Sequence, residues 1–149
     1  MNLLVSACLL GVNCRYCGDG KPCAEVLSLH EKYNLIPVCP EQLGGLPTPR
    51  PPVELQNGHV VDRAGNDRTE AFQRGAQETL KIARLFGCRS AVLKSKSPSC
   101  GYGKIYDGTF SGKLTEGCGI TARLLQKDGL HLLNEENAAA ELKKMLLGK

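Results

Sequence analysis

Short apolar runs, separated by polar segments rich in glycine, proline and cysteine, make up the hydrophobic pattern of this chain. Short runs of this kind, bounded by turn residues, are typical of strands buried on both faces of a sheet. Four of them are predicted strands, at residues 2–7, 35–38, 89–93 and 130–133. Helices are predicted between and after them, at residues 22–33, 67–86, 120–127 and 134–146. Strands that alternate with helices predict an α/β fold with a mainly parallel sheet.

Local signals set the ends of the predicted helices. Pro22 suits the first turn of a helix, and Asn134 is a candidate N-cap for the last one. Asp67 and Glu70 resemble a capping box, and Gly87 is expected to end the helix that follows them.

The segments between these elements predict loops and one hairpin. Residues 39–52 (CPEQLGGLPTPRPP) hold five prolines and two adjacent glycines, a composition that predicts an ordered loop or a mobile lid without a helix. Residues 53–61 predict a hairpin around Asn57-Gly58. Residues 94–103 (KSKSPSCGYG) predict a further loop.

Composition narrows the class of protein. The chain has 149 residues, of which 42% are hydrophobic and 23% charged, which fits one globular domain over residues 1–149. A net charge of +4 without a Lys/Arg block, and the lack of tryptophan, favour neither a nucleic-acid polymer nor a membrane as partner. The apolar run at residues 3–12 is shorter than the roughly 20 residues of a membrane span and has no basic flank. We therefore expect a cytoplasmic protein.

Eight cysteines are the unusual feature of the composition: Cys8, Cys14, Cys17, Cys23, Cys39, Cys88, Cys100 and Cys118. Without an export signal we expect reduced thiols, which in polar loops suggest metal binding or catalysis. Cys8 and Cys39 each follow a predicted strand directly, and Cys100 lies in the loop after a third. Because sites in parallel sheets form beyond the carboxyl ends of the strands, these thiols are expected at one edge of the sheet. Three soft thiolates there suit an iron–sulfur cluster with one open iron; the alternative is three buried, inert thiols.

The other cysteines and the histidines allow different interpretations. Cys14 and Cys17 form a CxxC pair, which is a candidate dithiol redox site or half of a zinc site. The residues interpreted as structural are His30, His59, His131, Cys23, Cys88 and Cys118.

Polar residues beside the three thiols are candidates for catalysis and substrate binding. Glu41, two residues after Cys39, is a candidate general base, and a solvated loop glutamate is the alternative. Ser97 is a candidate to orient a water or a substrate carbonyl, or to close the hydrogen bonds of its own loop. One of Lys94 and Lys96 is expected to meet an anionic substrate group. The residues predicted to contact substrate are Ser6, Gly44, Gly45, Arg50, Lys94 and Ser99.

Five segments of the chain together resemble a known family. They are SACLLGVNCRY (6–16), PVCPEQLGGLPTPRPPVE (37–54), GNDRTEAFQRGA (65–76), LKSKSPSCG (93–101) and YDGTFSGKLTEGCGITARLL (106–125). In this order they are similar to the short form of the thiouracil desulfurase family, over nearly the whole chain. The combination is specific, whereas each motif alone is not.

This resemblance implies a Rossmann-like three-layer α/β sandwich with a [4Fe-4S] cluster held by Cys8, Cys39 and Cys100, the fourth iron being free of protein ligands. It implies Glu41 as the acid–base residue and Ser97 as a second catalytic residue. The implied reaction replaces the sulfur of a thiouracil or its nucleotide with oxygen and releases hydrosulfide, so the expected partner is a small thiolated pyrimidine. Because exchanging C=S for C=O needs no net electrons, we expect a non-redox hydrolysis. We expect a monomer or a weak dimer.

Two positions depart from the family pattern. Cys17 stands where relatives usually carry Asp, and Cys118 where an acidic or polar residue is expected. Three alternatives to the desulfurase stay open at this point. They are a cluster-bearing sulfur carrier or redox protein without hydrolytic activity, a zinc-binding module built on Cys14 and Cys17, and a cofactor-free α/β protein with buried thiols.

Overall fold

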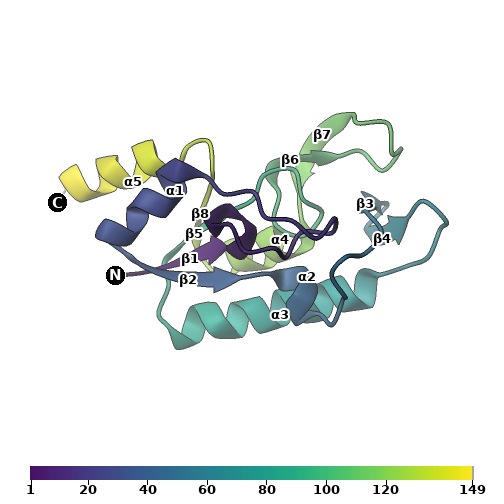
Figure 1. Ribbon diagram of the computed structural model, residues 1–149, viewed down its shortest axis with the longest axis horizontal. Coiled ribbons are helices and arrows are strands. Elements are labelled where there is room, and N and C mark those ends of the chain that lie inside the picture. The colour runs from purple at the N-terminus through teal and green to yellow at the C-terminus, as the bar shows by residue number, and fades with distance from the viewer. Residues whose placement is uncertain (149) are drawn as a thin grey trace.

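A four-stranded parallel sheet forms the centre of the molecule (Figure 1). The computed structural model describes residues 1–148. The strands of the sheet are β1 (Asn2–Ser6), β2 (Asn34–Val38), β5 (Ser90–Leu93) and β8 (His131–Asn134). Their order across the sheet is β2-β1-β5-β8, and each neighbouring pair is parallel. The four predicted strands and the mainly parallel sheet are therefore confirmed.

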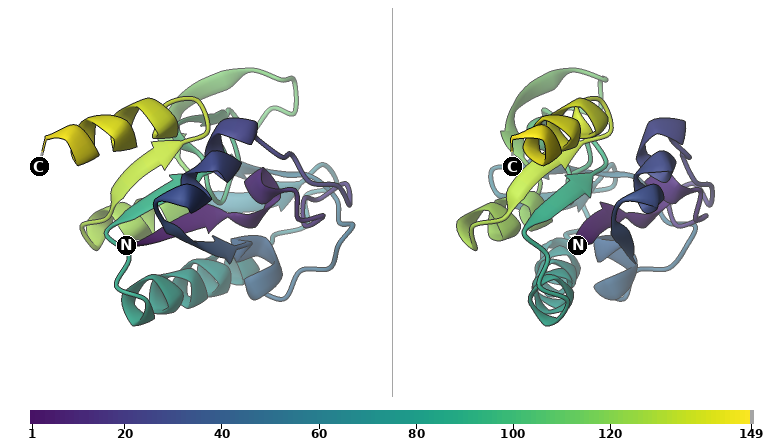
Figure 2. Two further views of the ribbon diagram at one scale, coloured as in Figure 1. Left: turned by 60° about the vertical axis from the view of Figure 1, so that its left-hand side comes forward. Right: turned by 90° about the vertical axis from the view of Figure 1, so that its left-hand side faces the viewer.

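Helices cover both faces of this sheet and complete three layers (Figure 2). They are η1 (Ala7–Leu10), α1 (Ala24–Leu27), η2 (Ser28–Glu31), α2 (Pro40–Leu43), α3 (Thr69–Leu85), α4 (Ile120–Lys127) and α5 (Ala138–Leu147). Buried side chains of α3 and α4 pack on one face of the sheet, and those of α1 and α5 pack on the other. The predicted three-layer α/β sandwich is confirmed.

Strand β1 shows why its sequence is apolar without alternation. Leu3 and Val5 belong to the core beneath α1 and α5, whereas Leu4 belongs to the core beneath α3 and α4. All three side chains are at most 1% exposed. A central strand of a parallel sheet has helices on both faces, so each of its positions is buried.

Two antiparallel hairpins lie outside the central sheet, at the end of the molecule away from both termini (Figure 1). They are β3 (Val53–Gln56) with β4 (His59–Asp62), and β6 (Tyr102–Tyr106) with β7 (Leu114–Cys118). The first was predicted, and Asn57 and Gly58 both have the positive φ of its tight turn, 49° and 82°. The second was not predicted, because its strands lack a regular alternation of apolar and polar residues.

Local differences from the predictions concern helix lengths and ends. Residues 39–52 do contain a short helix, α2, because its first proline stands at the first helical position, where no N–H is needed, and Gly44 ends it. The helix predicted over residues 22–33 is limited to α1 and the 3₁₀ turn η2. Helix α5 begins at Ala138, one turn after the predicted cap, because Asn134 ends strand β8.

No helix within residues 1–148 combines the length and the apolar character that crossing a bilayer requires.

Candidate active site

Three cysteines meet in one cavity beyond the carboxyl ends of the central strands. Cys8 lies in η1, directly after β1, and Cys39 directly follows β2 as the N-cap of α2. Cys100 lies in the segment that connects β5 to β6. All three line a cavity of about 480 Å³. Their meeting follows from topology, because β1 is hydrogen-bonded to both β2 and β5 and the three strands end at the same edge of the sheet.

A fourth thiol, that of Cys14, lies in the same cavity. Its side chain is buried, and the residue is 2% exposed. Cys39 Sγ lies 3.6 Å from the Cys14 carbonyl oxygen, to which it donates a hydrogen bond. Cys17, its partner in the CxxC pair, is exposed, lies outside the cavity and donates to the carboxylate of Asp19. The two thiols of the pair therefore occupy different environments.

Burial and hydrogen bonding raise the pKa of three of the cavity thiols, those of Cys14, Cys39 and Cys100. Burial raises the pKa of the Cys100 thiol to about 12, against an opposing hydrogen bond from Ser6. A hydrogen bond with Cys14, together with burial, raises the pKa of Cys39 strongly. For Cys14 the hydrogen bond with Cys39 favours the thiolate, but a hydrogen bond with Cys8 and burial raise the pKa to about 11. Thiols of this kind lose their protons when a metal binds them.

The arrangement of the thiols distinguishes between kinds of metal site. Within residues 1–148, no group of three or more His, Cys, Asp or Glu side chains converges closely enough to hold a single metal ion. A mononuclear zinc site on Cys14 and Cys17 therefore has no support in this part of the chain. Ligands of an iron–sulfur cluster bind separate irons, so soft thiols that come from separate segments and meet in one cavity suit a cluster.

Glu41 enters the cavity from the first turn of α2, two residues beyond Cys39. Helix α2 is fixed against α3 by close backbone contact, in which a Cβ on Gly75 would lie only 1.9 Å from the Pro40 carbonyl oxygen. The Glu41 side chain is 17% exposed, and Arg50 Nε donates to its Oε1 at 3.0 Å. The ligand candidate and the candidate base are thus placed by one rigid segment.

Ser97 holds the turn that carries Cys100. Its Oγ accepts hydrogen bonds from the backbone N–H groups of Ser99 and Cys100, each at 3.1 Å. Ser97 lines the cavity, and its hydroxyl hydrogen is not used by these two bonds, in which the oxygen is the acceptor. The serine therefore both shapes the thiol-bearing turn and retains a donor beside it.

Some of the residues predicted to contact substrate line the cavity, and others do not. Ser6, Arg50 and Lys94 line the cavity, but Lys94 Nζ is paired with Glu135 at 3.2 Å. Ser99 lies outside it, 1% exposed, with its Oγ 2.9 Å from Thr121 Oγ1. Gly44 and Gly45 are also absent from the cavity lining among residues 1–148. Gly44 instead allows α2 to approach α3, since a Cβ there would lie 2.0 Å from the Ala71 carbonyl oxygen.

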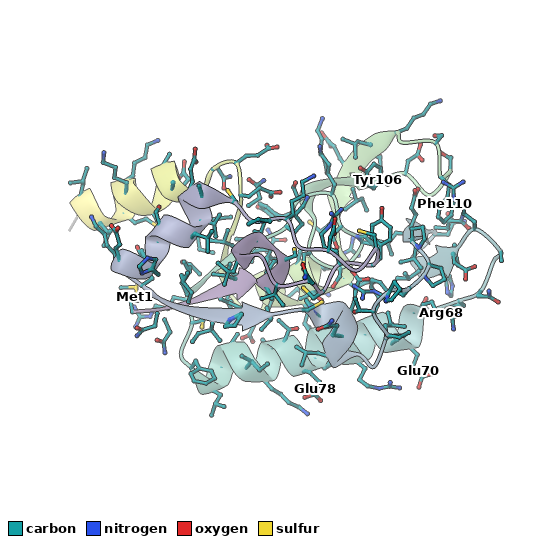
Figure 3. The ribbon with its side chains drawn as sticks, in the orientation of Figure 1. Met1, Arg68, Glu70, Glu78, Tyr106 and Phe110 are labelled. Atoms are coloured by element: carbon teal, nitrogen blue, oxygen red, sulfur yellow. The ribbon has the colours of Figure 1, made fainter. Side chains whose placement is uncertain are left out.

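The two hairpins contribute residues to the cavity lining that the sequence did not predict. Glu54, from β3, accepts hydrogen bonds from the backbone N–H groups of Gly108 and Phe110 in the other hairpin, at 3.0 and 3.1 Å. Tyr106 and Phe110 are both on this side of the molecule (Figure 3). The Arg63 guanidinium lies 5.4 Å from the centre of the Phe110 ring, and both residues line the cavity. Asp107-Gly108 and Ser111-Gly112 are typical of turns, but nothing in the sequence shows that the two hairpins dock on each other.

Positively charged side chains without an ion-pair partner among the described residues also line the cavity. The lining includes Lys21, Arg63 and Lys96. In the part of the chain that the structure describes, none of the three has a carboxylate within 4.0 Å. Lys96 also has a left-handed backbone, with φ of 68°, a conformation that costs energy for a residue other than glycine and is common at functional sites. These positive charges favour an anionic group on whatever enters the cavity.

A cavity at the carboxyl edge of a parallel sheet, lined by buried and partly buried thiols, a carboxylate and a serine, is the arrangement of an α/β enzyme. Comparisons with known proteins specify the class. Residues 3–137 match the family model described as 2-thiouracil desulfurase. The chain is also 40% identical over 143 residues to the uncharacterized protein YbbK of Bacillus subtilis, covering 89% of this chain and 95% of that protein.

A solved structure gives the same result. It is described as the [4Fe-4S]-dependent thiouracil desulfidase TudS, is 41% identical to this chain, and superimposes with a TM-score of 0.91 over 98% of both chains. The chain belongs to the 2-thiouracil desulfurase family and is a desulfurase. The family resemblance noted from the sequence motifs is confirmed.

Proposed function

We propose that this protein binds a [4Fe-4S] cluster through Cys8, Cys39 and Cys100, with one iron free of protein ligands, and desulfurates a thiolated pyrimidine without redox chemistry. The observation that carries the proposal is the meeting of these three thiols with Glu41 and Ser97 in one cavity. Membership of the desulfurase family and the cluster dependence printed for TudS support it.

The cavity fits such a cofactor by the chemistry of its donors. Its thiols are soft and wholly or partly buried, and they come from three separate segments. When bound, a cluster with an open iron supplies a Lewis acid suited to a thiocarbonyl sulfur. The protein's own part is to hold the thiolates, to exclude bulk water and to place a base and a hydroxyl beside the reacting carbon.

Glu41 is the group that moves a proton in this proposal. Its carboxylate accepts a proton from a water molecule, which then adds to the thiocarbonyl carbon. The Ser97 hydroxyl donates a hydrogen bond that orients the water or the ring. The reaction consumes one water and breaks the C=S double bond. The oxygen of the water becomes the carbonyl oxygen, one of its protons leaves with sulfur as hydrosulfide, and the other passes through Glu41 to solvent. The valences of carbon and sulfur are balanced without electron transfer.

The free cations of the cavity favour a nucleotide among the thiolated pyrimidines. Thiouracil is neutral near pH 7, whereas its nucleoside monophosphate carries a phosphate that Lys21, Arg63 or Lys96 can bind. The aromatic rings of Tyr106 and Phe110 add surfaces on which a pyrimidine can stack. We therefore regard a thiolated uridine nucleotide as the second candidate substrate beside thiouracil.

The test is anaerobic purification, with iron and acid-labile sulfide counted per chain, followed by incubation with thiouracil and, separately, with 4-thiouridine 5′-monophosphate. We expect a brown protein that forms the oxo pyrimidine and hydrosulfide in equal amounts. Iron and sulfide without oxo product would indicate the sulfur carrier instead. Zinc without iron would indicate the zinc-binding module, and a colourless, metal-free protein the cofactor-free alternative.

Single substitutions assign the ligands. Cys8→Ser, Cys39→Ser and Cys100→Ser are each expected to lose iron and activity together. Cys17→Ser is the matched control, because Cys17 lies outside the cavity and serine keeps a donor to Asp19. Full iron content and full rate in any of the first three variants would remove that cysteine from the ligand set.

We also propose that the protein is a monomer or a weak dimer and that it is cytoplasmic. Sedimentation of the loaded protein tests the oligomeric state, and fractionation of the source cells tests the location.

A further inference from the structure

Arg50 lines the cavity, and its buried guanidinium is hydrogen-bonded to several groups of the protein. Only 5% of its side chain is exposed. Its Nε donates to Glu41 Oε1 at 3.0 Å, and its Nη2 donates to the Cys14 carbonyl at 2.9 Å. Its Nη1 donates to Thr48 Oγ1 at 3.0 Å and to the Pro47 carbonyl at 3.2 Å. A guanidinium has five N–H groups, so these bonds leave one for any other partner.

These contacts argue against the predicted role of Arg50 as a substrate contact. A substrate phosphate or carbonyl is bound best by a guanidinium with two parallel donors to offer. The donors of Arg50 instead point at groups of the protein, and a buried carboxylate without this partner would carry an uncompensated charge. The free cations of the cavity are better placed to bind substrate.

The contacts also show what Arg50 fixes. Only Oε1 of Glu41 accepts from it, and no other group within residues 1–148 donates to the second oxygen, Oε2. A carboxylate held at one oxygen keeps a fixed direction and leaves the other oxygen available to accept a proton from water. General-base catalysis depends on this kind of geometry, since the base must lie within hydrogen-bond distance of the proton it removes.

Arg50 further joins the base to the loop after β1. Its side chain holds the Cys14 carbonyl, and its backbone N–H donates to the Tyr16 carbonyl at 2.8 Å. The same carbonyl of Cys14 accepts from the Cys39 thiol. One side chain therefore ties together the segments that carry Glu41, Cys14 and Cys39.

We propose that Arg50 is a positioning residue that sets the direction of the Glu41 carboxylate and its distance from the thiol-bearing loops. The proposal rests on the function proposed above, in which Glu41 is the base. It predicts that Arg50 acts through Glu41 and contributes little to substrate affinity.

The first experiment compares Arg50→Lys with the parent, both loaded with iron and assayed on the same thiolated pyrimidine. Lysine keeps the charge but cannot hold Glu41, Thr48 and the Cys14 carbonyl at once. We expect kcat to fall by about 10- to 100-fold, as for a base displaced by about 1 Å, with KM within about twofold of the parent. Arg89→Lys is the control, because Arg89 is exposed, precedes the amino end of β5 and does not line the cavity.

A double substitution shows whether Arg50 acts through Glu41. If it does, Glu41→Gln/Arg50→Lys will have the same kcat as Glu41→Gln alone, because no base remains to be positioned. Multiplied effects of the two changes would contradict the proposal. Iron and sulfide per chain, together with the visible absorption spectrum, are measured for each variant, so that a lost cofactor is not mistaken for a displaced base.

A milder variant covers the case in which Arg50→Lys does not fold. Thr48→Val removes one of the acceptors that hold the guanidinium, and Thr48 does not line the cavity. We expect a drop in kcat of a few-fold with full iron content. If the parent is active and both variants have its kcat, or differ from it only by a higher KM, the positioning role is overturned. The proposed function would then still stand. A loaded parent that releases no hydrosulfide would overturn both.

Discussion

Glu41 and Ser97 are the candidate catalytic residues whose surroundings the structure defines most closely. Each lines the cavity and each stands in the same short segment as a candidate cluster ligand, Cys39 or Cys100. The motifs that carry these pairs could be recognised in the sequence. Their surroundings could not, because no sequence pattern shows that Arg50 turns back on Glu41 or that it reaches the carbonyl of Cys14, 36 residues away.

At this scale we predict that Glu41→Gln keeps the cofactor and loses turnover. Glutamine is isosteric and still accepts from Arg50, but it cannot take a proton from water. The expected loss of kcat is about 10²- to 10⁴-fold, with iron content unchanged. Rates of hydrosulfide release, normalised to iron, measure it. Turnover within threefold of the parent would remove Glu41 as the base.

Ser97 allows a second prediction, because it has two roles that different substitutions separate. Ser97→Ala removes the acceptor for the N–H groups of Ser99 and Cys100, a loss comparable to that of an N-cap, about 0.5–2 kcal/mol of stability. Ser97→Thr keeps the hydroxyl. We expect the alanine variant to unfold at lower urea concentration and to turn over more slowly, and the threonine variant to keep most of the stability. Equal urea midpoints for all three proteins would contradict the structural role.

The elements that place the site pack through small residues and paired charges. Helix α2 meets α3 at Gly44 and Gly75, where there is no room for a Cβ. The sequence did not reveal this crossing, since a glycine in a helix is normally a destabilising choice and gives no hint of its partner. Helix α2 was not predicted either. The prolines of residues 39–52 suggested a loop, although Pro40 suits the first position of a helix.

Gly75→Ala tests this helix crossing. The added Cβ would lie 1.9 Å from the Pro40 carbonyl oxygen, so α2 must move, and we expect a loss of about 1–3 kcal/mol of stability together with slower turnover. Gln77→Ala, on the exposed side of the same helix, is the control. Urea unfolding followed by circular dichroism measures both. A Gly75→Ala protein as stable as the control would show that the contact is not tight.

The loop after β5 depends on a paired carboxylate, Glu135, which gives a pH dependence. Burial acts to raise the pKa of Glu135, but the N–H of Ser95 and the Lys94 ammonium outweigh it and hold the pKa below its usual value. A lowered pKa in the folded state means that the ionised group stabilises the protein above its unfolded pKa of about 4.3. This stabilisation is lost as the pH falls through the folded pKa.

Glu135→Gln is therefore expected to be less stable than the parent at pH 7, by about 1–3 kcal/mol for bonds to a charged group. The difference should shrink as the pH falls below about 4.3. Urea midpoints at several pH values test this, with Glu136→Gln, an exposed neighbour, as control. A difference that stays constant down to pH 3 would contradict the ionic contribution.

For the molecule as a whole, the alternation of strands and helices was enough to predict the layers and the parallel sheet. The rule that sites form beyond the carboxyl ends of strands then brought three distant cysteines together. What could not be predicted was the hairpin of β6 and β7 and its contact with β3 and β4, because irregular short strands leave no clear pattern and docking between hairpins is a tertiary event.

The cofactor proposal makes a prediction at this scale too. A cluster held by three loops binds the folded state and not the unfolded one, so it adds to stability. Removing iron with a chelator under anaerobic conditions is expected to lower the melting temperature by roughly 6–12 °C, equivalent to about 3 kcal/mol. Differential scanning calorimetry of loaded and stripped protein measures the change. Equal melting temperatures would show that the loops gain nothing from the cofactor.

The separation of the hairpins from the central sheet has a consequence for how this enzyme can be altered. The candidate ligands and the base stand on η1, on α2 with its N-cap and on the connection from β5 to β6, whereas Arg63, Tyr106 and Phe110 stand on or beside the hairpins. Exchanging hairpin side chains would therefore retarget the enzyme toward other thiocarbonyl compounds without rebuilding its reactive centre. A library confined to these walls is a rational starting point for new desulfurisation catalysts.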